Sequence, residues 1–249
     1  MEPVAGGGAM KASVVIPTFN ESAAIAAVIE EIPPDVALEI IVADGGSTDG
    51  TQAAARAAGA TVIDAGRGYG RACMAGAIAA RSPVIVFLDG DGADRGDLLG
   101  SIAGPVLAGT HDFVIASRTR GQRDPGSMLW HQVLAGRLAG WGMGALYGAS
   151  YSDMCAFRAI RKDVLNGLDM REMTYGWNIE MQMKAARSGL RILEVPVPYR
   201  CRLGGVSKVA GSLRGTVRAS GKIVSTFVRV AADRGSDRGS DRRRTSRPE

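Results

Sequence analysis

Residues 84–94 read VIVFLDGDGAD, an apolar β-branched run that ends directly on two aspartates, Asp89 and Asp91. In an extended chain, residues i and i+2 point to the same side, so we expect the two carboxylates to converge on one point. Two neighbouring carboxylates repel each other unless a cation lies between them, and a hard divalent ion that also binds a diphosphate meets this need. The alternative is a turn at Asp91-Gly92 followed by a helix N-cap at Asp94 or Asp97.

This strand is the last of four that alternate with helices in the first 90 residues. Apolar runs predict strands at 13–17, 39–43, 61–64 and 84–88, and Ala-rich spacing predicts helices at 22–32, 51–58 and 70–80. Such alternation predicts right-handed βαβ units and a mostly parallel sheet flanked by helices. Ligands of these sheets bind at the carboxyl ends of the strands, so the loops that follow the four strands are the candidate site.

The second half alternates less regularly. We expect helices at 98–108, 128–146 and 176–188, and strands at 113–117, 153–160 and 190–195. The Gly-rich residues 1–10 and the DRGS-repeating residues 233–249 are predicted to be disordered, because they lack the apolar residues that a packed core needs. One α/β domain is therefore expected over 11–210, followed by a helix at 211–232.

Composition excludes several classes of protein. The chain has 249 residues, of which 46% are hydrophobic, enough for a sizeable core. Cys73, Cys155 and Cys201 are too few and scattered for a disulfide framework, which favours a cytoplasmic location. The chain has only two histidines, His111 and His131, which argues against a His-rich zinc site and against a Ser-His-Asp hydrolase. No apolar run reaches the ~18 residues of a membrane span, and residues 1–10 do not resemble a signal peptide.

The net charge of +5 is unevenly distributed. Residues 199–232 carry seven basic side chains and no acidic one, whereas residues 1–198 are net acidic. The basic stretch predicts an anionic partner near the C-terminus. Between Val209 and Ala232 the basic residues fall beside an apolar stripe at helical spacing, which predicts an amphipathic basic helix. This helix either packs on the core with a solvated charged face or lies on anionic lipid.

Three more loops follow the predicted strands. The first, PTFNE (17–21), fits a capping box from Thr18 to Glu21 and also offers a helix N-terminus to a nucleotide. It contains no G-x-G-x-x-G, which argues against a dinucleotide-binding domain. The second, DGGSTDGT (44–51), is a Gly turn with Asp49 as N-cap, or presents Asp44 to a base or ribose. The third, GRGYGR (66–71), is a flexible basic loop that fits a phosphate or nucleoside clamp.

Together, PTFNE, ADGGSTDGT, GRGYGRA and FLDGDGAD resemble the nucleotide-sugar-binding half of a family 2 glycosyltransferase of GT-A fold. They most resemble the branch of dolichyl- and polyprenyl-phosphate sugar synthases. In the second half, ASR (116–118), SDMCAFR (152–158), GWNIE (176–180) and the R-x-G-G-x-S-K motif at 202–208 support this branch. The resemblance covers residues 11–210.

The resemblance implies a role for each matching residue. Asp89 and Asp91 would bind Mg²⁺ or Mn²⁺ on the donor diphosphate, with Arg67 and Gly68 closing over the nucleoside. The residues that would frame the nucleoside are Pro17, Thr18, Asn20, Glu21 and Asp44. The acceptor phosphate would be held by Arg118, Arg202, Ser207 and Lys208. The residues expected to carry catalysis are Asp91, Arg118, Arg202 and Glu180.

The sequence also departs from the family pattern. Gly45 replaces the second Asp of the usual Asp-Asp-Gly-Ser, and Arg67 replaces a Lys. Ala93 stands where a Gln commonly follows the metal pair. The helix after residue 127 offers His131 and Arg137 where the family has an Arg at the helix start.

The function that this resemblance implies is metal-dependent, inverting transfer of a hexose from a UDP- or GDP-linked sugar to a polyprenyl or dolichyl monophosphate. Such an acceptor is already anionic and needs no strong general base, whereas a hydroxyl acceptor would need Asp153 or Glu180 as base. The alternatives of another class are a nucleotidyltransferase, whose basic Gly-rich first loop is missing here, and a non-catalytic binding module, which has no need of a metal pair.

We expect a cytoplasmic enzyme, peripheral on the inner face of the cell membrane. Its C-terminal helix or a membrane partner protein would bring it to the acceptor, and no nucleic acid partner is expected.

Overall fold

The computed structural model describes residues 10–149, 151–204 and 213–244. Its centre is a seven-stranded sheet in the order β3-β2-β1-β4-β6-β5-β7. All neighbouring strands are parallel except β6, which runs antiparallel to β4 and β5. The strands are β1 (Ala12–Thr18), β2 (Ala37–Asp44), β3 (Thr61–Asp64), β4 (Val84–Phe87), β5 (Phe113–Ser117), β6 (Arg158–Arg161) and β7 (Ile192–Pro196). The predicted mostly parallel sheet is confirmed.

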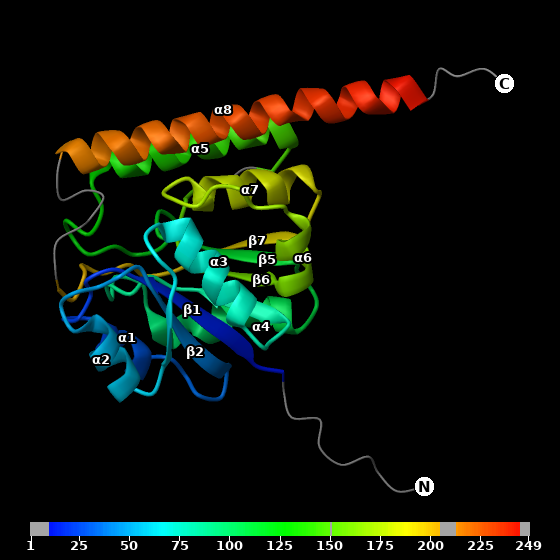
Figure 1. The fold of residues 1–249 in the computed structure, drawn as a ribbon. Coiled ribbons are helices and arrows are strands. Elements are labelled where there is room, and N and C mark those ends of the chain that lie inside the picture. Colours follow the sequence, from blue (N-terminus) through cyan, green and yellow to red (C-terminus); the bar gives the residue numbers. More distant parts are fainter. Residues whose placement is uncertain (1–9, 150, 205–212, 245–249) are drawn as a thin grey trace, which may run out of the picture.

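Helices flank this sheet (Figure 1). They are α1 (Ile25–Glu30), α2 (Thr51–Ala57), α3 (Tyr69–Ala79), α4 (Leu99–Leu107), α5 (Trp130–Tyr147), α6 (Lys162–Gly167), α7 (Trp177–Arg187) and α8 (Leu213–Arg244). The short helix α6 was not expected, and the strand expected at 153–160 begins only at Arg158. The preceding residues form a loop instead, because the Asp153 side chain bonds to Arg118 rather than extending the sheet.

Close packing at Gly76 places α3 on the sheet. A Cβ at this position would lie 2.3 Å from Cγ1 of Val15 in β1, so only glycine allows this approach. The strands β1 and β4 are buried along their whole length. Phe87 at the end of β4 meets Trp177 of α7 edge-on, with ring centroids 6.2 Å apart. The core thus holds the end of β4, where the two aspartates follow, in a fixed position.

The helix starts differ from the sequence prediction. The capping box from Thr18 to Glu21 is wrong, because Thr18 still belongs to β1 and α1 begins at Ile25 with no side-chain cap. The Thr18 hydroxyl instead donates to Asp44, 3.4 Å away. At α2 the N-cap is Gly50, although Asp49 accepts a hydrogen bond from the backbone N–H of Thr51 at 3.1 Å.

The helix α8 lies along α5 and packs on α7 (Figure 1). Its buried side includes Ala219, Thr226 and Val230, so the helix is part of the folded domain. It continues to Arg244, whereas the sequence predicted an end at 232 and disorder beyond. The stretch from 233 to 244 has no apolar residue, and its two glycines weaken a helix, but it contains no proline, so the helix can continue through it. Of the predicted disordered N-terminus, residues 1–9 lie outside the described residues. None of the helices in the described ranges has the length and apolar character to cross a membrane.

Candidate active site

The two aspartates after β4 lie at the carboxyl edge of the sheet. The hydroxyl of Tyr69 donates to Oδ1 of Asp89 at 3.1 Å. Asp91 accepts a hydrogen bond from the backbone N–H of Ala93 at 2.9 Å, and its Oδ2 lies 2.7 Å from Nη2 of Arg202. The chain therefore brings together three residues that the sequence predicted for one site: Asp89, Asp91 and Arg202.

Asp89 and Asp94 have less compensating charge than Asp91, which pairs with Arg202. Burial, followed by the charges of Asp91 and Asp94, raises the pKa of Asp89 to about 8. Burial also raises the pKa of Asp94 to about 6, with Asp91 adding to the rise and Arg118 opposing it. Sequence reasoning treated Asp94 only as a helix cap. Its position three residues after Asp91, in the same loop, was the available signal.

This donor set fits a hard divalent cation. Carboxylate oxygens are the ligands that Mg²⁺ and Mn²⁺ prefer, and such ions take further oxygens from water and phosphate. Among the described residues, no group of three or more His, Cys, Asp or Glu side chains forms a complete metal-binding cluster. Asp89 and Asp91 therefore remain the predicted ligands, and a bound diphosphate would have to complete the coordination of an ion held by them.

The segment around Arg202 is fixed to the acidic loop by its backbone. The N–H of Leu203 donates to the Asp91 carbonyl at 3.0 Å, and Nε of Arg200 donates to the Gly92 carbonyl at 2.6 Å. Within the described residues, the buried Nη1 atom of Arg202 has no hydrogen-bond partner. A buried guanidinium nitrogen without a partner is costly, and an anion bound beside Asp91 would satisfy it. Ser207 and Lys208, predicted for the same role, lie outside the described residues.

Arg118 is held by Asp153 through two side-chain hydrogen bonds. Its Nε and Nη2 donate to the two carboxylate oxygens, each at 2.7 Å, and its guanidinium lies 4.9 Å from the ring centroid of Tyr199. Burial alone would raise the pKa of Asp153, but the hydrogen bonds and charge of Arg118 outweigh burial and lower it. A carboxylate in this state is a weak base, which disfavours Asp153 as the base for a hydroxyl acceptor.

Asp44 organises its own loop. Its buried carboxylate accepts hydrogen bonds from the side chains of Thr18, Ser47 and Gln52, and from the backbone N–H groups of Gly46 and Ser47. Burial would raise its pKa, but the hydrogen bonds from Ser47, Gln52 and Gly46 lower it. These hydrogen bonds hold the Asp44 carboxylate in place and shape the loop from 44 to 52 around it.

The first two loops are joined by side chain to backbone hydrogen bonds. Asn20, in the left-handed region with φ 54°, accepts from the Thr48 N–H at 2.9 Å, and its own N–H donates to Ser47 at 2.8 Å. The N–H of Glu21 donates to the Thr51 hydroxyl at 2.8 Å. Pro17 is buried inside β1. The predicted nucleoside residues thus form one connected rim at the carboxyl edge.

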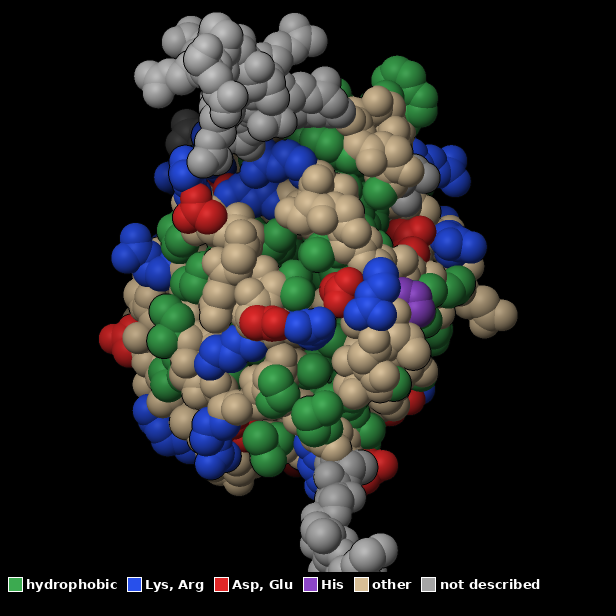
Figure 2. Space-filling view, turned by 90° about the vertical axis from the view of Figure 1, so that its right-hand side faces the viewer, with side chains coloured by type: hydrophobic (Ala, Val, Ile, Leu, Met, Phe, Trp, Pro, Cys, Tyr) green, Lys and Arg blue, Asp and Glu red, His purple; other side chains and the backbone are tan. Residues whose placement is uncertain are grey.

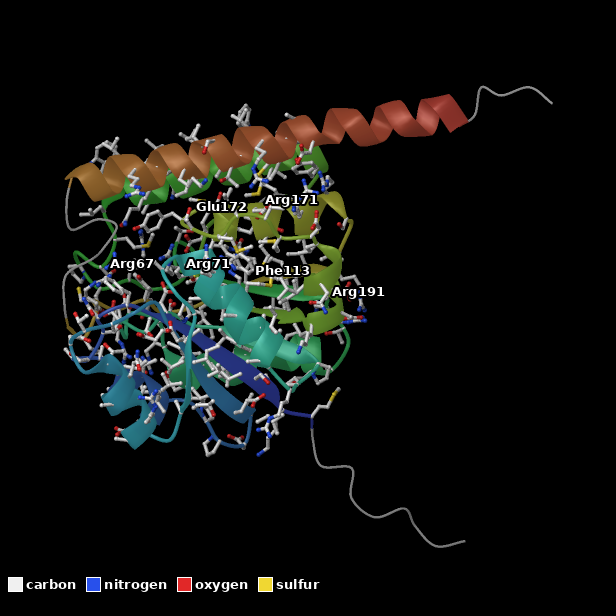
Figure 3. All side chains as sticks on the ribbon, in the orientation of Figure 1. Arg67, Arg71, Phe113, Arg171, Glu172 and Arg191 are labelled. Carbon is white, nitrogen blue, oxygen red and sulfur yellow. The ribbon has the colours of Figure 1, made fainter. Side chains whose placement is uncertain are left out.

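The Gly-rich third loop packs tightly against residues 172–173. A Cβ on Gly68, where φ is 131°, would lie 2.5 Å from the Met173 carbonyl oxygen, and one on Gly70 would lie 2.4 Å from that of Glu172. Arg67 stacks over the ring of Phe19 at 4.3 Å. Figure 3 labels Glu172 between α8 and the start of α3. The loop that carries Arg67 therefore rests on a segment that α8 in turn contacts.

Glu180 helps to hold the segment from 171 to 172 against α8. Its fully buried carboxylate lies 3.1 Å from Nζ of Lys184 and 3.3 Å from Nη2 of Arg229 of α8, and it accepts the backbone N–H groups of Arg171 and Glu172. Glu172 itself pairs with Lys222 of α8 at 3.1 Å. Glu180 was predicted as a catalytic residue, and sequence reasoning missed its partners because they come from distant segments. Its surroundings are those of a structural ion pair.

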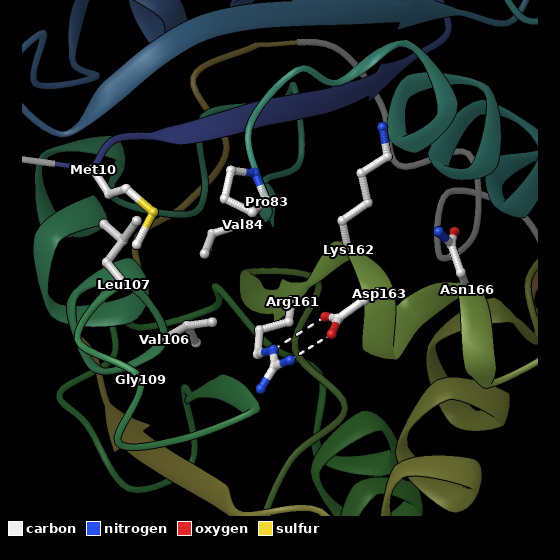
Figure 4. Close-up of a pocket in the computed structure, with 10 residues that line it drawn as sticks. All are labelled: Met10, Pro83, Val84, Val106, Leu107, Gly109, Arg161, Lys162, Asp163 and Asn166. Atoms are coloured by element: carbon white, nitrogen blue, oxygen red, sulfur yellow. Dashed lines mark hydrogen bonds and ion pairs between the residues drawn. The ribbon is translucent and has the colours of Figure 1, made fainter.

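A pocket of about 520 Å³ lies at the opposite end of the sheet (Figure 4). It is lined by residues at the starts of β1 and β4 and the end of β6, among them Met10, Val84 and Arg161, and by none of the predicted site residues. Figure 2 looks onto this end, where Lys and Arg side chains lie beside Asp and Glu side chains. Ion pairs such as Arg191–Asp112 at 2.7 Å account for this mixed charge. We place the active site at the carboxyl edge rather than in this pocket.

Comparisons with known proteins identify the family of this chain. Residues 13–168 match the model of glycosyl transferase family 2. An uncharacterised glycosyltransferase of Mycobacterium tuberculosis is 34% identical over 212 residues, which cover 83% of this chain and 93% of the relative. An undecaprenyl-phosphate mannosyltransferase of Micrococcus luteus is 30% identical over 83% of this chain and 90% of its own length.

A solved structure has the same fold. The glucosyl-3-phosphoglycerate synthase of Mycobacterium tuberculosis, in complex with Mn²⁺, UDP-glucose and phosphoglyceric acid, superposes with a TM-score of 0.73 at 25% identity. The match covers 90% of this chain and 80% of that one. The family and the GT-A fold expected from the sequence are thereby confirmed: the chain belongs to the family 2 glycosyltransferases.

Proposed function

We propose that this glycosyltransferase moves a hexose from a UDP- or GDP-linked sugar to a polyprenyl monophosphate. The observation that carries the proposal is the 2.7 Å contact between Arg202 and Asp91, with the buried Nη1 of Arg202 lacking a partner among the described residues. A cation-binding carboxylate and a phosphate-binding arginine then stand side by side. The name of the Micrococcus luteus relative supports a lipid phosphate as acceptor.

Asp89 and Asp91 would hold the divalent metal, Mg²⁺ or Mn²⁺. Bound there, the metal would stabilise the charge that develops on the departing nucleoside diphosphate. The Mn²⁺ of the mycobacterial synthase structure supports a metal in this fold. Arg67, which stacks on Phe19 beside the nucleoside rim, is positioned to cover the donor from the solvent side.

The remaining residues would bind the acceptor. Arg202 would hold the acceptor phosphate by charge-assisted hydrogen bonds, joined by Arg118, Ser207 and Lys208. Because the acceptor is anionic, its oxygen can attack the anomeric carbon without a base, in a single displacement that inverts the configuration there. The engagement of Asp153 with Arg118, and of Glu180 with Lys184, argues against the alternative that either carboxylate deprotonates a hydroxyl acceptor.

A polyprenyl phosphate resides in a membrane, so the proposal implies a peripheral enzyme on the cytoplasmic face. The basic stretch at 199–232 supports contact with anionic lipid. Either this chain binds the bilayer itself or a membrane partner protein recruits it.

A second acceptor class is a small phosphorylated acid, which the mycobacterial synthase structure contains. It offers the same phosphate to Arg202 without the lipid. The distinction between the two acceptors is therefore an experimental one.

The test is a transfer assay with labelled UDP- and GDP-hexoses and either a short-chain polyprenyl phosphate or phosphoglyceric acid. We expect label in the lipid extract, and an acceptor KM at least about tenfold higher for Arg202→Ala because charge-assisted hydrogen bonds are lost. Arg191→Ala, whose side chain pairs with Asp112 at the other end of the sheet, is the matched control. Transfer to phosphoglyceric acid alone would overturn the lipid assignment.

A further inference from the structure

The helix α5 faces solvent with its largest apolar side chains. Trp130, Leu134, Leu138 and Trp141 recur at helical spacing, and their exposed fractions are 77%, 47%, 60% and 75%. These residues form one stripe along the exposed side of α5.

The inner side of α5 carries glycines. A Cβ on Gly140 would lie 1.7 Å from the Tyr151 carbonyl oxygen, and one on Gly136 would lie 3.8 Å from Cα of Asp153. A helix that serves only the core of a soluble protein has the reverse arrangement, with large apolar residues inside. The outward stripe therefore favours an apolar environment beyond what the described residues supply.

The neighbouring helix α8 extends the stripe. Phe227 of α8 meets α5 at Gly142, where a Cβ would lie 2.9 Å from Cζ of the phenyl ring. Val217, Val224 and Val228 are 63%, 61% and 60% exposed, and at about 100° per residue they fall on one narrow face of the helix. Figure 1 shows the two helices side by side along one edge of the molecule. Contiguous apolar surface of this kind marks an interaction site.

The charge on α5 and on the part of α8 from Leu213 to Ala232 has a single sign. Between Trp130 and Tyr147, and between Leu213 and Ala232, there is no acidic residue. The basic residues in these two ranges are Arg137, Arg214, Arg218, Lys222 and Arg229, of which Lys222 and Arg229 pair with the buried Glu172 and Glu180. An apolar stripe with tryptophans and a basic border is typical of helices that lie in the interface of an anionic bilayer.

We propose that the outer faces of α5 and α8, here called the α5–α8 surface, dock directly on an anionic lipid bilayer. Trp141, Leu138 and the α8 valines enter the interface, and the exposed Arg137 and Arg218 contact lipid phosphates. The inference deepens the proposed function and rests on it for its purpose. Because α5 contacts the Asp153 loop with its inner face, about one helix diameter of 10 Å separates the bilayer from the Arg118–Asp153 pair.

The experiment is co-sedimentation of the full chain with vesicles of phosphatidylcholine, with and without phosphatidylglycerol, in the absence of acceptor. We expect binding to the anionic vesicles, and a partition coefficient at least roughly tenfold lower for Leu138→Ser/Trp141→Ser. The matched control is Ile78→Ser on α3, an equally exposed apolar residue outside the surface, which should bind like the wild type. Tryptophan emission should shift to shorter wavelength on binding, because Trp130 and Trp141 are exposed while Trp177 is already buried.

Absence of vesicle binding by the wild type, or equal binding by the double variant, would overturn the proposal. So would a dimer in ultracentrifugation that the double variant converts to monomer without any vesicle binding, since the surface would then join two copies of this chain. Transfer to a short-chain, water-soluble polyprenyl phosphate without vesicles does not need the surface. Failure of that transfer with intact vesicle binding would therefore refute the proposed function and not the docking surface.

Discussion

The buried Asp44 and the half-buried Asp89 at the carboxyl edge differ in how many hydrogen bonds they accept from the chain. Asp44 receives donors from four residues, whereas among the described residues Asp89 receives one, from Tyr69. A carboxylate with its lone pairs filled shapes a loop, and one with free lone pairs in a buried site requires a proton or a cation. Residue type and spacing alone do not distinguish a carboxylate that shapes a loop from one that binds a cation, whereas the hydrogen-bond partners do.

The buried Arg118–Asp153 pair predicts a pH dependence of stability. The pKa of Asp153 is lowered in the folded state, so its contribution is fully present above its unfolded value of about 4 and is lost as the pH falls through the folded value. Asp153→Asn should reduce the free energy of unfolding at pH 7 by about 3 kcal/mol, because a buried charge loses its partner. Denaturant melts between pH 7 and 3 should show the gap between variant and wild type narrowing at low pH. A constant gap would contradict this account.

Glu180 offers a test between a catalytic and a structural role. Glu180→Gln removes the charge that Lys184 and Arg229 face in a fully buried position, so we expect a loss of about 3 kcal/mol in unfolding free energy. The kcat of the folded fraction, measured below the melting transition, should stay within about threefold of the wild type. A drop of about a thousandfold in kcat, with the melting temperature preserved, would instead identify Glu180 as a general base.

At the scale of elements, α8 and the start of α3 are linked through one short segment. Lys222 pairs with Glu172, and the carbonyl groups of Glu172 and Met173 contact Gly70 and Gly68. The N–H of Arg71 also donates to the Met173 carbonyl at 3.0 Å. The position of the donor loop thus depends on how the segment from 172 to 173 is held between α3 and α8.

The close contact between Gly70 and the Glu172 carbonyl group predicts the effect of adding one methyl group. Gly70→Ala would place a Cβ 2.4 Å from the Glu172 carbonyl oxygen, so the loop must shift, at a cost of about 1–3 kcal/mol in stability. We expect the Kd for a nucleoside diphosphate to rise with it, as measured by calorimetry. The control is Gly221→Ala in the exposed interior of α8, where the added Cβ would meet no described atom within 4 Å outside the helix's own backbone. This variant should be neutral or more stable, because alanine favours the helix.

At the scale of the whole molecule, the two ends of the sheet have different roles. The acidic loop, Arg202 and the nucleoside rim gather at the carboxyl edge, while the opposite end carries paired surface charges. The sequence predicted the strands and this edge well, because apolar runs and the residues that follow them are local patterns. It did not predict the antiparallel start of β6 at Arg158 or the short helix α6. The sequence also did not predict the ion-pair partners of Glu180, because ion pairs between distant segments leave no local pattern in the sequence.

The proposed function depends most on Asp89 and Asp91 as the ligands of a metal that binds the donor diphosphate. The direct measurement is calorimetric binding of UDP and GDP with Mn²⁺ and with a chelator, for the wild type and for Asp89→Asn/Asp91→Asn. We predict that one nucleotide binds the wild type at least about tenfold more tightly with Mn²⁺, because the ion neutralises both carboxylates and diphosphate. The double variant should keep its fold and lose this metal dependence. An unchanged gain from Mn²⁺ in the double variant would contradict the central assignment.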